Sequence, residues 1–398
     1  MEIKISMPRK SVYNNKARLV ADIQYDNTTY PLWLEVDAQY ADYLCDDRCD
    51  AFVLAVLHLA MVIDYDIFCD GPVSDVLFER IQNEFLPLMR RLNSISTQLK
   101  AFVMPIPEGL EQQTGSAVGT GCSCGVDSLH VFANHPDITH VCVWNVRGSL
   151  LDVTQEERAQ AWVDIVNRAK AFAAETGKEL VVVDTNFDGG SIPGLRWDGM
   201  TTNGNLFCIF AMQGFWAKYY VASNGVANGA ALKLDDKMSS AFYEFYLFPL
   251  VSNKRIQILL DGVGLDRLDK IRCLASYEYA YKYLNVCHYI TPDGRNCSHS
   301  CSKCMYTMFE LDALGKLELF EKLFDVQYFQ AHKEEYLAEY WRGVIQKNPN
   351  ALELRRVYNT SSIPLAIRVK ACWIIFKKGM KKIMRGGKVR YGTFSSRG

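Results

Sequence analysis

Two groups of residues in this 398-residue sequence have types and spacings suited to chemistry. The first is the turn Gly121-Cys122-Ser123-Cys124-Gly125-Val126-Asp127-Ser128, whose small residues let a backbone wrap closely round a phosphate. Ser123 and Ser128 can donate hydroxyl hydrogen bonds, and Asp127 can cap a following helix or hold Mg²⁺ against the phosphates. The alternative is an ordinary strand-to-helix turn with a Ser/Asp cap.

The second group is a cysteine cluster, in which nine, three and two residues separate Cys287, Cys297, Cys301 and Cys304. Four thiolates at such intervals can close a tetrahedral Zn²⁺ site, and zinc bound there would contribute directly to folding. The last three cysteines also have the spacing with which radical-SAM enzymes hold a [4Fe–4S] cluster. We rank zinc ahead, because the residues that follow look helical and basic rather than like a barrel.

The elements around the turn predict a parallel sheet. Helical patterns separate short apolar runs, and this alternation implies parallel strands joined by right-handed crossovers, with helices on both faces. The predicted strands are Ala117–Gly121, His140–Val146, Glu179–Thr185, Lys218–Ser223 and Arg255–Asp261. The turn therefore follows the first strand and opens a helix, where free N–H groups attract anions.

The flanking sequence predicts further regions round this α/β, Rossmann-like, five-stranded core. Residues 1–112 read as a smaller α+β domain of unknown role, and residues 113–265 as the phosphate-binding domain. Residues 266–325 read as a helical region stapled by the cysteines, and residues 326–398 as a helical, basic tail. Ala51–Ile63 is apolar all round and reads as a buried helix.

Composition bounds the class of protein. Hydrophobic residues make up 49% of the chain, charged residues 22%, and the net charge is −1, so no global field favours nucleic acid or membranes. The first residues lack the apolar core of a signal peptide, and no apolar run is long enough to cross a bilayer. We expect a cytoplasmic protein with reduced cysteines and no transmembrane segment.

The turn resembles the Ser-Gly-Gly-x-Asp-Ser signature of the PP-loop ATP pyrophosphatases, also called adenine nucleotide alpha hydrolases. It matches at Ser123, Gly125, Val126 (the free position), Asp127 and Ser128, and departs at Cys124, where the family usually has glycine. A Cβ at that position restricts φ and narrows the approach to a phosphate. The resemblance covers roughly residues 115–305 and implies that Ser123–Ser128 cradle the phosphates of ATP.

The same resemblance implies roles for residues at the other strand ends. Asn145 and Val146, with Trp144, would lie near the adenine, and Asp184 and Ser223 would face the ligand from the third and fourth strands. Arg267 and Lys270 match the family's late basic residues, which meet phosphate or substrate. With Asp127 they form the predicted catalytic set, although each cation can equally belong to a solvated helix face.

A PP-loop domain followed by four cysteines resembles the 7-cyano-7-deazaguanine synthase group. The resemblance implies an ATP-dependent ligase or amide synthetase that adenylates a small-molecule carboxylate or amide-type oxygen for attack by ammonia or an amine, with ATP, Mg²⁺ and Zn²⁺ as ligands. Sulfur transfer to an RNA base, with Cys124 or Cys208 as persulfide carrier, is one alternative. A catalytically weakened nucleotide-binding protein is another. A homodimer is left open.

Residues 365–398 hold ten Lys or Arg and no Asp or Glu, interleaved with apolar side chains. Such a segment can lie on an anionic membrane, contact RNA or bind a charged partner. We favour the simpler interpretation, a terminal helix packed by its apolar face and followed by a frayed end, so nucleic acid is not the favoured partner.

Overall fold

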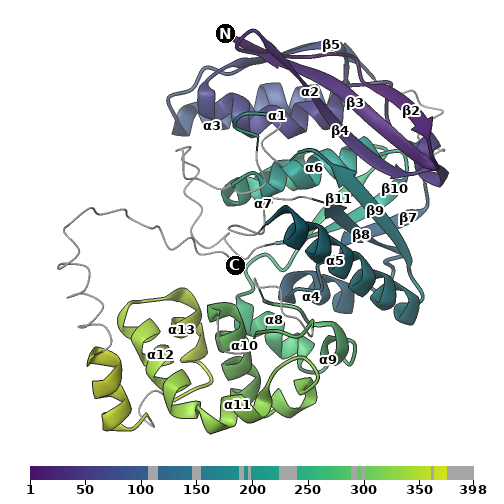
Figure 1. Cartoon of the computed structure of the whole chain (residues 1–398). Helices are drawn as coiled ribbons and strands as arrows, with labels where there is room; N and C mark the ends of the chain where they lie inside the picture. Colours follow the sequence, from purple (N-terminus) through teal and green to yellow (C-terminus); the bar gives the residue numbers. More distant parts are fainter. Residues whose placement is uncertain are drawn as a thin grey trace. The chain divides into compact units, whose positions relative to one another are not determined.

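A computed structural model describes residues 1–105, 115–145, 154–187, 192–195, 199–223, 240–287, 294–297, 301–359 and 363–373 (Figure 1). Contacts divide the chain into two compact units. Unit 1 holds Met1–Ser123 and Asn134–Gly264, and unit 2 holds Cys124–Ala133 and Leu265–Gly398. Among the described residues, none of the helices is both long and apolar enough to span a bilayer.

Unit 1 is built on one mixed sheet of eleven strands in the order β11-β10-β7-β8-β9-β4-β3-β1-β5-β6, with β2 paired to β3. The N-terminal strands are β1 (Glu2–Ile5), β2 (Arg9–Tyr13), β3 (Lys16–Tyr25), β4 (Thr28–Asp37), β5 (Asp66–Ser74) and β6 (Leu99–Met104). The others are β7 (Ala117–Gly121), β8 (His140–Asn145), β9 (Glu179–Thr185), β10 (Trp216–Ala222) and β11 (Gln257–Asp261).

The five strands β7 to β11 are the predicted ones, and they pair in parallel with one another. The prediction of a five-stranded sheet with a separate α+β domain before it is nevertheless wrong. Strand β9 is not an edge, because it pairs antiparallel with β4 at Leu34↔Thr185 and Glu35↔Asp184. This pairing covers backbone groups that an edge strand would leave open, and it joins the N-terminal strands to the same sheet.

The N-terminal part of the sheet centres on the hairpin of β3 and β4. Their register runs from Lys16↔Asp37 to Tyr25↔Thr28, which leaves Asp26 and Asn27 as a two-residue loop. Both have positive φ, 49° and 59°, as a type I′ turn requires. Alternate residues of β3 are buried, so one face of this hairpin belongs to the core.

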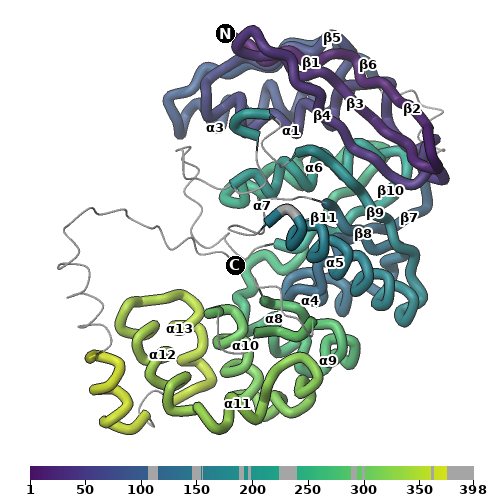
Figure 2. Tube along the Cα trace, viewed as in Figure 1, coloured from purple at the N-terminus to yellow at the C-terminus, as the bar shows by residue number. Residues whose placement is uncertain are grey.

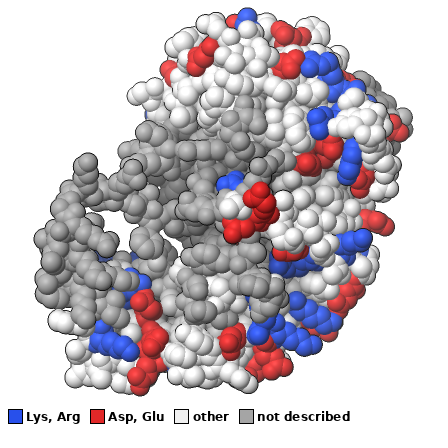
Figure 3. Space-filling view, in the orientation of Figure 1, with Lys and Arg blue, Asp and Glu red and all other residues white. Residues whose placement is uncertain are grey.

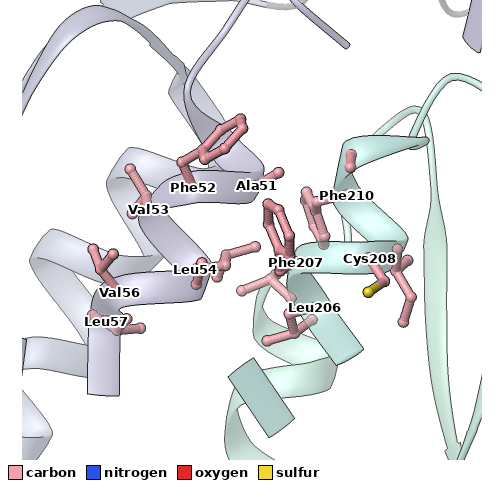
Figure 4. Close-up of a cluster of buried hydrophobic side chains, with 14 of the residues drawn as sticks. Ala51, Phe52, Val53, Leu54, Val56, Leu57, Leu206, Phe207, Cys208 and Phe210 are labelled. Atoms are coloured by element: carbon pink, nitrogen blue, oxygen red, sulfur yellow. The ribbon is translucent and has the colours of Figure 1, made fainter. Parts of the chain in front are cut away.

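Helices cover both faces of the parallel strands. On one face α1 (Asp50–Ile63) and α6 (Thr201–Ala211) run side by side (Figures 1 and 2). Their apolar side chains interdigitate, and the rings of Phe52 and Phe207 meet edge to face at 5.3 Å (Figure 4). On the other face α5 (Gln155–Thr176) packs on β8 and β9. Helix α1 is buried on nearly all sides, as predicted.

Shorter elements complete unit 1. Helices α2 (Asp75–Glu79) and α3 (Leu86–Leu92) are joined by a π-helical segment at Arg80–Phe85, and α7 spans Glu244–Leu250. The ends of α5 follow the predicted signals. The Thr154 hydroxyl and the Glu157 carboxylate form a reciprocal capping box, and Gly177 ends the helix with φ 68°.

Unit 2 is helical in the residues described. It contains α4 (Val126–Asn134, of which Asn134 is assigned to unit 1), α8 (Arg267–Leu274), α9 (Ala280–Tyr283), α10 (Ser302–Ala313), α11 (Val326–Ala331), α12 (Lys333–Ile345) and α13 (Pro349–Leu354). Residues 365–373 are also helical. Helix α10 is central, because it contacts α8 and α13 and its Phe309 meets the rings of Phe329 and Tyr340.

Candidate nucleotide and metal sites

The turn that the sequence analysis singled out for phosphate binding lies between β7 and α4, the position that the sequence predicts. The division between the units falls between Ser123 and Cys124, so the turn begins in one unit and continues in the other. Helix α4 starts at Val126, and its first backbone bond runs from Leu129 N to Gly125 O at 3.0 Å. The first N–H groups of a helix have no partner within it, and they are the groups an anion can use.

Cys124 adopts the left-handed conformation, with φ 55°. Glycine reaches this region without strain, whereas a Cβ makes it costly. The turn therefore has the backbone of a glycine at the position where the PP-loop signature has one, but carries a cysteine. Cys124 is buried, and its carbonyl oxygen accepts a 2.8 Å hydrogen bond from Asn285 N, which holds the turn in unit 2.

Strand order places the turn at a topological switch point. Strand β7 lies between β8 and β10; β9 extends the parallel strands beyond β8, and β11 extends them beyond β10. The chain passes from β7 to β8 and β9 on one side, and it then returns to β10 and β11 on the other side of β7. In open α/β sheets, ligands bind beyond the carboxyl ends of the strands at such a point. The residue after β7 begins the predicted phosphate-binding turn.

Two of the three predicted catalytic residues lie together. The Lys270 ammonium donates to Asp127 Oδ1 at 2.5 Å, within unit 2. Lys270 is only 2% exposed, and the carboxylate offsets part of the cost of burying its charge. The pair brings a cation to the first turn of α4. Sequence reasoning named both residues, but not their contact.

Arg267, the third predicted catalytic residue, contacts a different helix. Its Nη2 donates to Thr307 Oγ1 at 2.9 Å, and its Nε lies 3.9 Å from Glu310 Oε2. Both partners are on α10, so the guanidinium is engaged in the helical core of unit 2. Ser128 also has a local role, because its hydroxyl donates to Gly125 O at 3.2 Å.

The strand ends of unit 1 carry two polar pairs. Asn145 Nδ2 donates to Asp184 Oδ1 at 2.8 Å, which joins the predicted adenine-side residues of β8 and β9. Ser223, after β10, donates from Oγ to Glu244 Oε1 at 2.9 Å. Glu244 is buried, and the sequence analysis did not identify it as a site residue. The signal that could have found it is its position as a single acidic residue in the aromatic run 242–248. Val146 lies outside the described residues.

The four cysteines converge in unit 2, as their spacing predicts, and can hold a metal ion. All four sulfur atoms lie within 4.8 Å of one another. Cys304 Sγ is 3.2 Å from Cys301 Sγ and 3.6 Å from Cys297 Sγ. A Zn–S bond of about 2.3 Å sets ligand sulfurs about 3.8 Å apart in a tetrahedron, so the cluster fits zinc closely. The neighbouring Cys297 thiol lowers the pKa of Cys287 to about 6. His288 and His299 lie outside the described residues.

Asn296 positions the backbone around Cys287, and the sequence analysis did not identify it as a site residue. Its Oδ1 accepts from Val286 N at 2.8 Å and Cys287 N at 3.1 Å, while its Nδ2 donates to Leu284 O at 3.0 Å. The side chain is buried and adjoins Cys297 in sequence, so one residue ties the first two ligands together. At the second pair, Cys304 N donates to Cys301 Sγ at 3.4 Å.

The charge on the face drawn in Figure 3 gives no separate indication of a ligand. On the face shown in Figure 3, Lys and Arg lie among Asp and Glu. Comparison with known proteins adds no family: no family model matches the chain, and neither a curated protein nor a solved structure matches it.

Proposed function

We propose that this chain is an ATP-dependent adenylating enzyme. The observation that carries the proposal is a turn with a glycine-like left-handed residue, after the central strand of a parallel sheet and at the start of a helix. The triphosphate of ATP would lie on Ser123–Ser128, where the N-terminal N–H groups of α4 attract negative charge.

The proposed reaction forms one bond and breaks another at the α phosphate. A carboxylate or amide-type oxygen of a small molecule attacks that phosphorus, the bond to the bridging oxygen breaks, and pyrophosphate leaves. Ammonia or an amine then attacks the activated carbon and releases AMP. Negative charge develops on pyrophosphate, and Lys270 with the α4 N–H groups would stabilise it. Asp127 would hold Mg²⁺, which supplies further charge neutralisation.

Sulfur transfer has less support from the cysteines. Cys208 on α6 is fully buried, and burial raises the pKa of its thiol far above the usual range. A persulfide carrier needs an accessible thiolate. Cys124 is buried as well. A nucleotide-binding protein with weakened catalysis remains the second candidate, and strain at Cys124 is the observation that favours it.

We propose zinc as the metal held by Cys287, Cys297, Cys301 and Cys304. Four protein thiolates leave zinc no open position, which is typical of structural rather than catalytic sites. The metal would then fix the loop before α10 and take no part in adenylation. Purified protein should be colourless and contain about one zinc per chain. A brown protein that absorbs visible light would indicate iron–sulfur instead.

Incubation with MgATP, ammonium and a panel of small carboxylates and amides tests the activity. We expect AMP and pyrophosphate in equal amounts, dependent on one member of the panel. Asp127→Asn and Lys270→Met should abolish both products, whereas Lys218→Met, a change in an exposed ion pair of unit 1, should not. ADP and phosphate as products would contradict the proposal, and ATP binding without AMP formation on any substrate would favour the regulatory candidate.

A further inference from the structure

The helix at residues 365–373 has apolar side chains on two opposite faces. Ile367 and Ala371 are buried, at 5% and 0% exposure. Leu365, Val369 and Trp373 are exposed by 75%, 60% and 54%. Each set repeats every four residues, and the two sets are offset by two residues, or about 200° round a helix. One stripe packs against unit 2 and the other faces solvent.

The helix is held on its inner side. The guanidinium of Arg368 lies 5.0 Å from the ring centroid of Trp341 on α12, and its Nε donates to Ile363 O at 2.9 Å. Ile363 is itself buried. The buried stripe of Ile367 and Ala371 agrees with the expected helix packed by its apolar face. That expectation does not explain the second, exposed stripe. Leu365, Val369 and Trp373 form a row of large apolar side chains on an outer face where polar residues are the rule.

Positive charge is segregated in the same part of the sequence. The whole chain has 44 Lys or Arg and 45 Asp or Glu. Residues 365–398 hold ten of these cations and none of the acids, so the rest of the chain has 34 cations against 45 acids. Two of the ten, Arg368 and Lys370, belong to the described helix itself.

We propose that this helix docks on an anionic lipid bilayer. Leu365, Val369 and Trp373 would enter the boundary between headgroups and acyl chains, and the cations would meet the negative headgroups. Aliphatic residues in the stripe favour lipid over RNA, which is bound through stacking aromatics and cations. The concentration of positive charge opposes a second copy of the same helix, because the two would repel each other.

Sedimentation of the full chain with vesicles tests the proposal. We expect binding to vesicles with about one third phosphatidylserine, little binding to pure phosphatidylcholine, and weakening by salt. The double variant Leu365→Ser/Val369→Ser should reduce the bound fraction at anionic vesicles by about tenfold or more. Phe102→Ser is the matched control, because Phe102 is 71% exposed on β6 of the other unit, and it should bind as the parent does.

Other measurements separate the remaining outcomes. Trp373 should shift its fluorescence to shorter wavelength on anionic vesicles, and Trp373→Ser should lose that change. Near-ultraviolet circular dichroism confirms that each variant is folded, which is expected at exposed positions. Unchanged vesicle binding by the double variant overturns the proposal. So does binding of single-stranded RNA without vesicle binding, or a concentration-dependent dimer that the double variant abolishes while vesicles stay unbound.

Discussion

The ammonium of Lys270 on α8 lies 2.5 Å from Oδ1 of Asp127 on α4, although 143 residues separate the two in sequence. Lys270 is almost completely buried, whereas the Asp127 side chain remains 31% exposed. A buried charge that loses its partner is costly, so the pair fixes how α8 meets the start of α4. It also places the Lys270 cation at the N-terminal end of α4, within unit 2.

The asymmetric burial of the pair predicts unequal effects of its two truncations. Asp127→Ala removes the carboxylate that faces a buried ammonium and should lower the free energy of unfolding by about 3 kcal/mol. Lys270→Met leaves the more exposed carboxylate, which water can solvate, and should cost about 2 kcal/mol or less. Urea denaturation of both variants measures the difference.

The double variant and an exposed pair serve as controls. Asp127→Ala/Lys270→Met should lose less than the sum of the single losses, because no unpaired charge stays buried. Lys218→Met breaks an exposed pair with Asp137, whose atoms lie 2.9 Å apart, and should cost below about 1 kcal/mol. Strictly additive losses in the double variant would show that the two residues do not act together.

The left-handed conformation of Cys124 predicts that replacing it with glycine and replacing it with a larger residue will have different effects. Cys124→Gly removes a left-handed cysteine, a gain of about 1 kcal/mol that the greater freedom of an unfolded glycine largely offsets. Stability should therefore change little, while ATP affinity rises, since the backbone can approach the phosphates more closely. Cys124→Val places a β-branched residue at positive φ and should lose both stability and ATP affinity. Calorimetric titration with ATP measures the affinities.

Cys122→Gly is the control for this substitution. Cys122 precedes Cys124 by two residues and is not among the residues with positive φ. Glycine there should destabilise by about 0.5 to 1 kcal/mol without improving ATP affinity. Equal ATP affinity in the parent and in Cys124→Gly would mean that the cysteine does not hinder the ligand.

The sequence predicts most of the parallel strands because each is a short apolar run between helical patterns. It does not predict that β9 pairs with β4. Only two residue pairs make that contact, and their partners lie about 150 residues apart in the sequence. Strand β2, whose residues are all exposed, carries no apolar signal either. Alternation reveals which face of a strand is buried, but not which strand lies beside it.

The candidate sites divide in the same way. Spacing alone brought the four cysteines together, since three of them lie within eight residues and a short loop must converge. Asn296 was missed because its role is to hydrogen-bond backbone groups of Leu284, Val286 and Cys287. An asparagine in the sequence does not by itself indicate such a role. Arg267 matched a pattern of basic residues, but its contacts with Thr307 and Glu310 are long-range.

Asn296 predicts a loss of metal affinity without loss of a ligand. Asn296→Ala frees the backbone that orients Cys287 and Cys297, and outer-shell changes of this kind typically weaken metal binding about 10- to 100-fold. Competition with a chromophoric chelator measures the affinity. Asn348→Ala is a matched control, because Asn348 caps α13 through Ala351 N and should cost about 1 kcal/mol of stability with metal affinity unchanged. Equal metal affinity in Asn296→Ala would refute a positioning role.

Glu310 predicts stability that falls as pH rises. Its carboxylate oxygens are buried without a hydrogen-bond partner among the described residues, and burial raises the pKa of Glu310 from 4.5 to about 8. The folded protein therefore binds a proton that the unfolded chain releases near pH 4.5, so this residue's contribution is fully present below that pH and is lost between about pH 4.5 and 8. The loss is at most about 5 kcal/mol, the equivalent of that difference in pKa.

Glu310→Gln should remove this part of the pH dependence, because glutamine keeps the shape of the protonated acid but has no proton to lose. We expect the variant to be less stable than, or equal to, the parent at pH 5 and more stable at pH 8.5, measured by urea denaturation at both. Glu334→Gln, the same change at an exposed position of α12, reports the effect of removing a surface charge. Parallel pH profiles for the parent and Glu310→Gln would show that the carboxyl stays ionised beside Arg267 in the folded protein, since only an ionised group would leave the profile unaltered.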